Sequence, residues 1–293
     1  MIEIRDLQLL SALARHRHFA KAAEECGISQ PAFSMRIRNL EDRLGVSIVR
    51  RANRFQGLTE EGEMIVQRAR RILDDTKALE QQVLATRGEI TGTLILGVIP
   101  TAIAFTGRLT KRFRQAHPRI VTRIETMSAT AIQHRLDEGS LDAGITYGDS
   151  IGTDLRQVQP LYEETYVLLV PSHMTDETGP LPWARVAEFP LSLLEPQMQN
   201  RRILDRIFAE QGLHPDVVAE TSGFTASMVM AREGLAATVV PRVLIRALGE
   251  LQGTKVLPLV DPIVSKPICL ATLSRDPELP TVQALRAVVT SLR

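Results

Sequence analysis

Aromatic residues and cysteines are scarce in this 293-residue chain, and each shortage excludes a class of protein. Aromatics make up 4% of the residues, so hydrophobic cores must be built mainly from Leu, Ile, Val and Ala. The two cysteines, Cys26 and Cys269, are too few for a disulfide framework, which favours reduced thiols. Redox sensing through them is an alternative, although the two residues fall in different predicted domains.

Long apolar runs and catalytic signatures are also missing. No run reaches the ~20 residues that a membrane-spanning helix needs, and the first residues, MIEIRDLQLL, do not have the pattern of a signal peptide. We therefore expect a cytoplasmic protein without a membrane partner. No nucleophile elbow, glycine-rich phosphate loop or metal-spaced His/Cys cluster occurs, so we expect a protein that is not an enzyme and has no cofactor or metal site.

Positive charge is concentrated in one segment, although the net charge of the chain is only +1. Residues 36–54 contain six arginines and only two acidic residues. A dense basic segment on a nearly neutral chain indicates that one domain contacts phosphate while another domain has a different task.

Residues 5–45 have the pattern of three short helices, followed by a small hairpin or wing up to residue 58. In the third helix Ser29 can act as N-cap and Pro31 lies in the first turn. Phe33, Ile37 and Leu40 form a narrow apolar stripe, and the opposite side carries small polar groups and arginine. Such a helix can enter the major groove of DNA, which predicts a winged helix-turn-helix. A simple amphipathic helix in a three-helix core is the alternative.

The segment 59–88 is predicted to form one long helix that begins after Thr59. Apolar and small residues recur along it at alternating intervals of four and three, at Ile65, Ala69, Ile72, Thr76, Leu79 and Val83. This heptad seam favours pairing with a second copy of the chain. The alternative is that the helix packs within its own domain.

The remaining segment, 89–293, alternates between apolar strands and helices, which predicts an α/β fold built on parallel strands. The order of elements repeats after a middle section. Two α/β halves of this kind are typical of a hinged binding protein with a cleft between its lobes. We therefore predict three parts: a DNA-binding domain over 1–58, a linker helix over 59–88 and an effector-binding domain over 89–293.

The run FAKAAEECGISQPAFSMRIRNLEDRLGVSIVRRANRFQGLTEEG resembles the N-terminal domain of LysR-type transcriptional regulators. The segments FRQAHP, LDAGI and AREGLAATVVP resemble landmarks of that family's regulatory domain. The resemblance covers nearly the whole chain. It implies a winged helix-turn-helix, a linker helix, and a two-lobed effector domain similar to the periplasmic binding proteins.

The resemblance also implies which residues contact DNA. Arg36 lies on the flank of the third helix and is assigned to phosphate, and Arg54 of the wing is assigned to the minor groove. Many family members have arginine at the position of Met35, which can make only apolar contacts with bases; Arg38 is the candidate to compensate. The predicted DNA-binding residues are Gln30, Pro31, Ser34, Met35, Arg36, Arg38, Arg51 and Arg54.

The resemblance implies a small-molecule site between the two lobes, and the sequence offers candidate residues at turns where strands meet helix N-termini. Free backbone N–H groups there suit a compact anion or a small polar metabolite. Each hydroxyl at these turns is as readily explained as a plain N-cap. Some relatives carry arginine where Tyr147 stands, which leaves Arg201 and Arg202 as candidate cations at the cleft edge. The predicted effector-binding residues are Thr101, Ser128, Thr130, Tyr147, Gln199, Asn200, Phe224 and Thr225.

The sequence thus predicts a DNA-binding transcriptional regulator controlled by a small-molecule effector. Its expected partners are double-stranded promoter DNA, the effector and a second copy of the chain in a homodimer. The family resemblance implies that the homodimer assembles into a homotetramer, and RNA polymerase is a further candidate partner. The alternatives are a thiol-based redox regulator and a ligand-insensitive DNA-binding protein.

Overall fold

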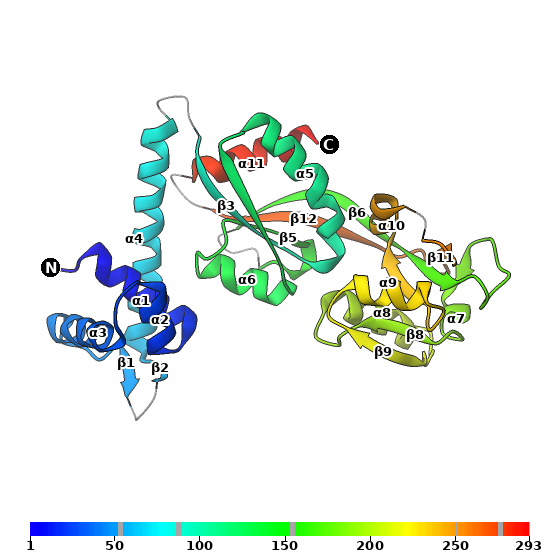
Figure 1. The fold of residues 1–293 in the computed structure, drawn as a ribbon, viewed down its shortest axis with the longest axis horizontal. Coiled ribbons are helices and arrows are strands. Elements are labelled where there is room, and N and C mark those ends of the chain that lie inside the picture. Colours follow the sequence, from blue (N-terminus) through cyan, green and yellow to red (C-terminus); the bar gives the residue numbers. More distant parts are fainter. Residues whose placement is uncertain (52–54, 86–89, 153–155, 250, 275–277, 293) are drawn as a thin grey trace. The chain divides into compact units, whose positions relative to one another are not determined.

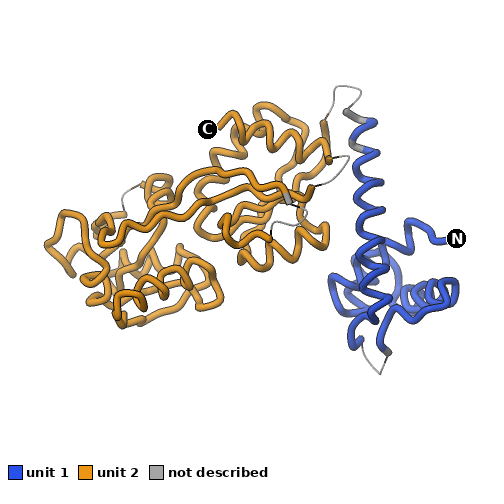
Figure 2. Tube along the Cα trace, turned by 180° about the vertical axis from the view of Figure 1, so that it is seen from behind, with its two compact units in different colours: residues 1–89 blue, residues 90–293 orange. Residues whose placement is uncertain are grey.

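The computed structural model describes the whole chain except residues 52–54, 86–89, 153–155, 250, 275–277 and 293. The chain divides into two compact units, Met1–Glu89 and Ile90–Arg293, which are coloured separately in Figure 2. Within the described ranges, no helix combines the length and the apolar character that crossing a membrane requires.

The N-terminal unit contains the three predicted short helices, the hairpin and the long helix. These elements are α1 (Ile4–His16), α2 (Phe19–Glu25), α3 (Gln30–Leu44), β1 (Val49–Arg51), β2 (Phe55–Leu58) and α4 (Glu60–Ala85), labelled in Figure 1. Their apolar faces share one core, in which Leu9, Leu10 and Phe33 are fully buried. Most of the buried residues of this core are aliphatic, as the composition predicts.

Helix α3 begins and ends where its sequence indicates. The Ser29 hydroxyl accepts a hydrogen bond from the backbone N–H of Ala32 at 3.4 Å, and Pro31 occupies the first turn. Gly45 adopts the left-handed conformation that terminates the helix. The predicted stripe of Phe33, Ile37 and Leu40 is buried, so the orientation of α3 about its own axis is fixed by its packing.

Helix α4 changes character along its length. The Thr59 hydroxyl caps it by accepting a 2.9 Å hydrogen bond from the N–H of Gly62. Near its start, Ile65 packs against the core of its own unit. This part of the predicted seam is therefore packed within the unit. Further along, Ile72, Leu79 and Val83 are exposed by 45%, 61% and 49%. The second half of the seam is therefore an apolar stripe that faces outward from its unit.

The C-terminal unit has two lobes. The first lobe contains β3 (Gly92–Val98), β4 (Ile120–Thr126) and β5 (Ala143–Tyr147) with α5 (Ile103–Ala116), α6 (Ala129–Asp137) and α11 (Pro280–Ser291). The second contains β7 (Leu181–Pro182), β8 (Leu191–Leu194), β9 (Val217–Thr221) and β10 (Thr238–Pro241) with α7 (Trp183–Val186), α8 (Gln199–Glu210), α9 (Phe224–Arg232) and α10 (Arg242–Leu248). Figure 1 shows the helices of each lobe packed around its strands.

Three further strands join the lobes: β6 (Arg156–Pro171), β11 (Thr254–Val260) and β12 (Ser265–Leu273). The early part of β6 pairs with β12 over Arg156–Thr165, and its later part pairs with β10 and β11 over Tyr166–Pro171. The strand thus passes continuously from one lobe into the other (Figure 1). Short 3₁₀ turns follow β3 (Pro100–Ala102) and β5 (Gly148–Ser150).

The expectation of a parallel sheet is only partly correct. β3 pairs in parallel with β4 and β5, and β8 pairs in parallel with β9, as the strand-helix alternation predicts. The pairings of β12 with β5 and β6, and of β6 with β10 and β11, are antiparallel. Because β12 pairs with strands that lie far away in the sequence, the local alternation gives no sign of these antiparallel pairings.

The exposed stripe on α4 predicts that two copies of the chain associate through this helix. Replacing both Ile72 and Leu79 with Glu places charge in a seam that would otherwise be buried, so we expect the assembly to dissociate. Light scattering on the full-length protein measures the mass. Gln67→Glu, on the opposite side of the same helix, is the control and should keep the wild-type mass. An unchanged mass in the Ile72/Leu79 variant would contradict association through this stripe.

Candidate functional site

The outer face of α3 is the first candidate site. Gln30, Pro31, Arg36 and Arg38 are exposed, and Met35 is exposed by 60%. Ser34 is half-buried beside them. The buried stripe on the other side of the helix holds this polar face outward, so six of the eight predicted DNA-binding residues share one accessible surface.

The hairpin is attached to the far end of α3 by a buried carboxylate. Glu41 is 9% exposed, and its Oε1 accepts the backbone N–H groups of Ile48 at 2.8 Å and Val49 at 3.1 Å. This contact fixes where the wing leaves the helix. Arg54 lies outside the described residues, as does the side chain of Arg51.

One arginine of the basic segment has a structural partner. Arg43 forms an ion pair with Asp6, whose carboxylate is 4% exposed and also accepts the backbone N–H of Glu3 at 3.2 Å. The pair connects α3 to the start of α1. Arg43 therefore supports the orientation of α3, while Arg36 and Arg38 remain on its exposed face.

The second candidate site is a small cleft between the lobes of the C-terminal unit. Five predicted effector-binding residues meet there: Thr101, Ser128, Tyr147, Gln199 and Asn200. They come from the turns after β3 and β4 and from the end of β5 in one lobe, and from the start of α8 in the other. The cavity measures about 10 Å³, which is room for about one water molecule. In this conformation the lobes are closed on each other.

Three predicted effector-binding residues do not line the cleft. Thr130 and Thr225 are exposed, and Phe224 is buried in an apolar cluster with Leu194 and Met228. The hydroxyl of Ser128, which does line the cleft, accepts the N–H of Ala131 at 3.2 Å. The N-cap explanation therefore accounts for the Ser128 hydroxyl, whereas it does not account for the buried Thr101.

Asn200 stands out because its whole amide lacks a hydrogen-bond partner. The residue is 3% exposed, and neither its Nδ2 nor its Oδ1 bonds to any described residue. An unsatisfied buried amide costs on the order of 1–3 kcal/mol. Such a group at the wall of a cleft offers one donor side and one acceptor side to a molecule that enters.

A buried glutamate lies directly behind the cleft. Tyr147 donates to Glu164 Oε1 at 2.9 Å, and Tyr166 donates to the same oxygen at 2.9 Å. The Tyr147 hydroxyl also lies 3.3 Å from the hydroxyl of Thr101. Glu164 is 2% exposed, and burial raises its pKa to about 7 although the two tyrosine hydrogen bonds lower it. The neutral acid is therefore the favoured form below about pH 7.

Sequence reasoning missed Glu164, although a signal for it was present. In a strand alternate residues share a face, so Tyr162, Glu164 and Tyr166 point the same way. A carboxylate placed between two tyrosines on one face of a strand, directly before the apolar run YVLLV, indicates a buried acid with hydroxyl partners. The alternation of residues between the two faces of β6 is the signal that identifies Glu164.

Arg201 is not an available cation at the cleft edge, contrary to expectation. Its Nη1 donates to the Leu194 carbonyl at 2.9 Å and to Glu220 at 2.8 Å, and its Nε donates to Asp205 at 2.7 Å. Two carboxylates neutralise the guanidinium and hold it against the end of β8. Arg202, the next residue, is exposed.

The raised pKa of Glu164 predicts that the C-terminal unit loses stability as the pH rises. Between about pH 4.5 and 7 the folded state keeps a proton that the unfolded state has lost, so the free energy of unfolding falls across this window and levels off above it. Glu164→Gln stays neutral and keeps the acceptor oxygen. It should unfold like wild type at pH 5 and be more stable by up to about 3 kcal/mol at pH 8.

Urea unfolding of the full-length protein at several pH values measures this difference. Glu163→Gln is the matched control, because Glu163 is the exposed neighbour on the other face of the strand. Parallel stability profiles for wild type and Glu164→Gln between pH 5 and 8 would show that Glu164 is not protonated in this range.

Family models match both units of the chain. The model described as "Bacterial regulatory helix-turn-helix protein, lysR family" matches residues 4–63, and "LysR substrate binding domain" matches residues 87–292. A curated relative, the hydrogen peroxide-inducible genes activator of Haemophilus influenzae, is 29% identical over 92% of this chain and 90% of its own length. OxyR of Escherichia coli K12, a DNA-binding transcriptional dual regulator, is 28% identical over 89% of this chain and 86% of its own length.

Solved structures show the same fold. Full-length OxyR from Pseudomonas aeruginosa, in variant form, superposes with a TM-score of 0.78 at 23% identity, covering 100% of this chain and 95% of its own. Full-length CbnR complexed with its target DNA superposes with a TM-score of 0.67 at 21% identity, covering 100% of both chains. With one family model on each unit and the reading helix and lobed domain in place, this chain belongs to the LysR family of DNA-binding transcriptional regulators with an effector-binding domain.

Proposed function

We propose that this regulator reads a specific promoter sequence with the N-terminal half of α3 and responds to a small polar molecule bound in the cleft. The exposed polar face of α3, held outward by the buried Phe33, Ile37 and Leu40, carries the first part of the proposal. Ser34, Met35 and Arg38 are assigned to base edges, and Arg36 to phosphate. Arg51 and Arg54 of the wing complete the proposed contacts.

The proposed assembly is a homodimer formed through the apolar stripe of α4. The homodimer further assembles into a tetramer, so that two N-terminal DNA-binding domains contact one operator. The protein acts in the cytoplasm, where promoter DNA and RNA polymerase are its macromolecular partners, and it has no catalytic step. The three segments 1–58, 59–88 and 89–293 serve as DNA-binding domain, dimerisation helix and effector domain.

The cleft is proposed to bind a small polar molecule through hydrogen bonds rather than through one ion pair. Tyr147 stands where an arginine could pair with a carboxylate, and Arg201 is already neutralised by Asp205 and Glu220. The unpartnered amide of Asn200 and the buried hydroxyl of Thr101 supply donors and an acceptor. Since the closed cleft holds about 10 Å³, binding of anything larger than water separates the lobes.

Sensing of peroxide through a thiol is less well supported, although the relative from Haemophilus influenzae is named a hydrogen peroxide-inducible genes activator. Reactive cysteines are accessible and have a lowered pKa. Burial raises the pKa of the Cys26 thiol despite the nearby Arg5, and Cys269 is 3% exposed on β12. A thiol reagent that leaves effector-dependent DNA binding unchanged would agree with control by a ligand.

The DNA-reading role predicts that Ser34→Ala and Arg38→Ala each weaken binding to the operator by ~1–3 kcal/mol, because each removes a contact to a base edge. Fluorescence anisotropy with operator and scrambled duplexes measures the loss, which should be smaller on scrambled DNA. Arg112→Ala, an exposed arginine of α5 in the other unit, is the control. Wild-type affinity in both α3 variants would mean that this helix does not read bases.

The role of the cleft predicts opposite effects of Asn200→Leu on stability and on response. Removing an unsatisfied buried amide should leave the unliganded protein as stable as wild type or more stable by about 1 kcal/mol. A metabolite that raises the melting temperature of wild type should not raise that of the variant. A thermal-shift screen of polar metabolites tests both effects, and a metabolite that stabilises both proteins equally binds outside the cleft.

A further inference from the structure

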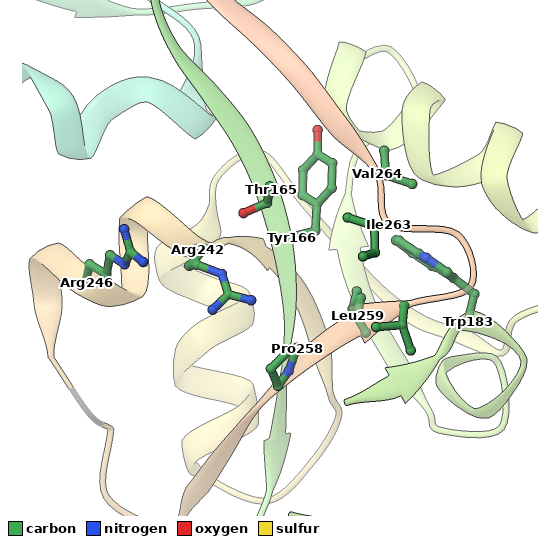
Figure 3. Close-up of a pocket in the computed structure, with 10 residues that line it drawn as sticks. Thr165, Tyr166, Trp183, Arg242, Arg246, Pro258, Leu259, Ile263 and Val264 are labelled. Carbon is green, nitrogen blue, oxygen red and sulfur yellow. The ribbon is translucent and has the colours of Figure 1, made fainter. Parts of the chain in front are cut away.

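A second, open pocket lies in the C-terminal unit, apart from the cleft. Its volume is about 390 Å³, within the range of small-molecule sites. It is bounded by α10, by β6 at Thr165 and Tyr166, by β11, and by the turn that leads into β12 (Figure 3). None of the predicted effector-binding residues lines it. The pocket therefore needs an explanation of its own.

Two arginines form the basic part of this pocket. Arg242 is half-buried and Arg246 is exposed, one turn apart on α10. Like charges at this spacing repel each other. Among the residues that the structure describes, neither guanidinium has a carboxylate partner, whereas Arg185, Arg201, Arg232 and other arginines of the same unit each form an ion pair.

Apolar side chains form most of the rest of the pocket, and Figure 3 shows Trp183, Ile263 and Val264 on the other side of β6 from the arginines. Trp183 is fully buried, and its indole N–H donates to the Pro262 carbonyl at 3.0 Å, which fixes the ring beside the turn. Ile263 on that turn is exposed by 74%, the second highest exposure of any large hydrophobic side chain that is described. Val264 continues this apolar wall.

We infer that this pocket binds a small organic anion. Its carboxylate or phosphate head group would be held by Arg242 and Arg246, and its apolar body would cover Ile263 and Val264 beside Trp183. An anion relieves the repulsion between the two arginines, and guanidinium groups bind both head groups through paired hydrogen bonds. The apolar body removes an exposed isoleucine from water. This site is additional to the proposed effector cleft, and its existence does not depend on that proposal.

The position of the pocket makes its occupancy relevant to the cleft. The ring of Tyr166 lines the pocket, and its hydroxyl donates to Glu164, which also accepts the hydroxyl of the cleft residue Tyr147. A ligand beside Tyr166 therefore contacts β6 at the residues where that strand passes between the lobes.

The single tryptophan of the chain, Trp183, is a built-in reporter for the test. Full-length protein is titrated with phenylacetate and phenylphosphate, which combine an anion with an apolar body, and with benzyl alcohol and inorganic phosphate, which each lack one part. We expect a saturable change in tryptophan fluorescence with at least one of the first two probes. Each of the other two should bind about tenfold more weakly or worse, a loss of about 1.4 kcal/mol.

Arg242→Gln combined with Arg246→Gln should weaken the binding of that probe by about tenfold or more. Arg206→Gln, which removes an exposed arginine from α8 of the same lobe, is the control and should bind like wild type. Circular dichroism verifies the fold of each variant, and calorimetry repeats the titrations without relying on the tryptophan.

Three outcomes would overturn the inference. The first is that neither anionic probe binds at millimolar concentration; if the double variant also has an altered mass in light scattering, the arginines belong to a contact between copies of the chain. The second is that benzyl alcohol binds as well as phenylacetate and phenylphosphate. The third is that the double variant retains the affinity of wild type. A cleft variant such as Asn200→Leu should bind the probe normally, so failure of the effector proposal would not be mistaken for failure of this one.

Discussion

Strand β6 is the constraint on which the C-terminal unit depends, because its backbone is hydrogen-bonded in both lobes. It pairs with β12 in one lobe and with β10 and β11 in the other, so the lobes cannot fold as independent bodies. Glu164 lies near the changeover between the two sets of pairings. Its carboxylate accepts hydrogen bonds from the hydroxyls of Tyr147 on β5 and Tyr166 on β6 itself. One buried acid thus joins the wall of the cleft to the strand that crosses between the lobes.

The sequence was sufficient for those parts of the fold that are governed by local rules. Ser29 and Pro31 mark the start of α3, and the spacing of Phe33, Ile37 and Leu40 identifies its buried side. Three short helices, a hairpin and a long helix follow from such signals, and the structure confirms them. The prediction that residues at turns between strand ends and helix starts form one site was correct for Thr101 and Asn200, which both line the cleft.

Long-range pairing and side-chain partners could not be obtained in this way. The antiparallel placement of β12 between β5 and β6 depends on contacts between segments more than one hundred residues apart, which no local period encodes. Arg201 shows the same limit, because its sequence position says nothing of Glu220. Thr130 lies two residues after the cleft residue Ser128, and Thr225 lies at the start of α9, yet both are exposed and neither lines the cleft.

The arginines of the two units differ in their partners. This difference distinguishes arginines that stabilise the fold from arginines that are available to bind another molecule. In the N-terminal unit the buried Asp6 holds Arg43, and the buried Glu41 holds the backbone of the wing, so these acids orient the reading helix without covering its outer face. Arg36 and Arg38 remain exposed where phosphates and bases can reach them. In the C-terminal unit Arg201 is neutralised by two carboxylates beside a cleft lined by hydroxyl and amide groups.

Arg242 and Arg246 resemble the exposed arginines of α3 rather than Arg201, which forms ion pairs. Both lack a carboxylate partner among the described residues, and both line the pocket beside α10. An arginine that serves only the fold is generally paired, as Arg43 and Arg201 are, because pairing offsets the cost of partial burial. The half-buried Arg242 guanidinium lies beside apolar side chains and lacks that compensation among the described residues. A bound anion would supply that compensation, just as DNA phosphate would pair with the exposed arginines of α3.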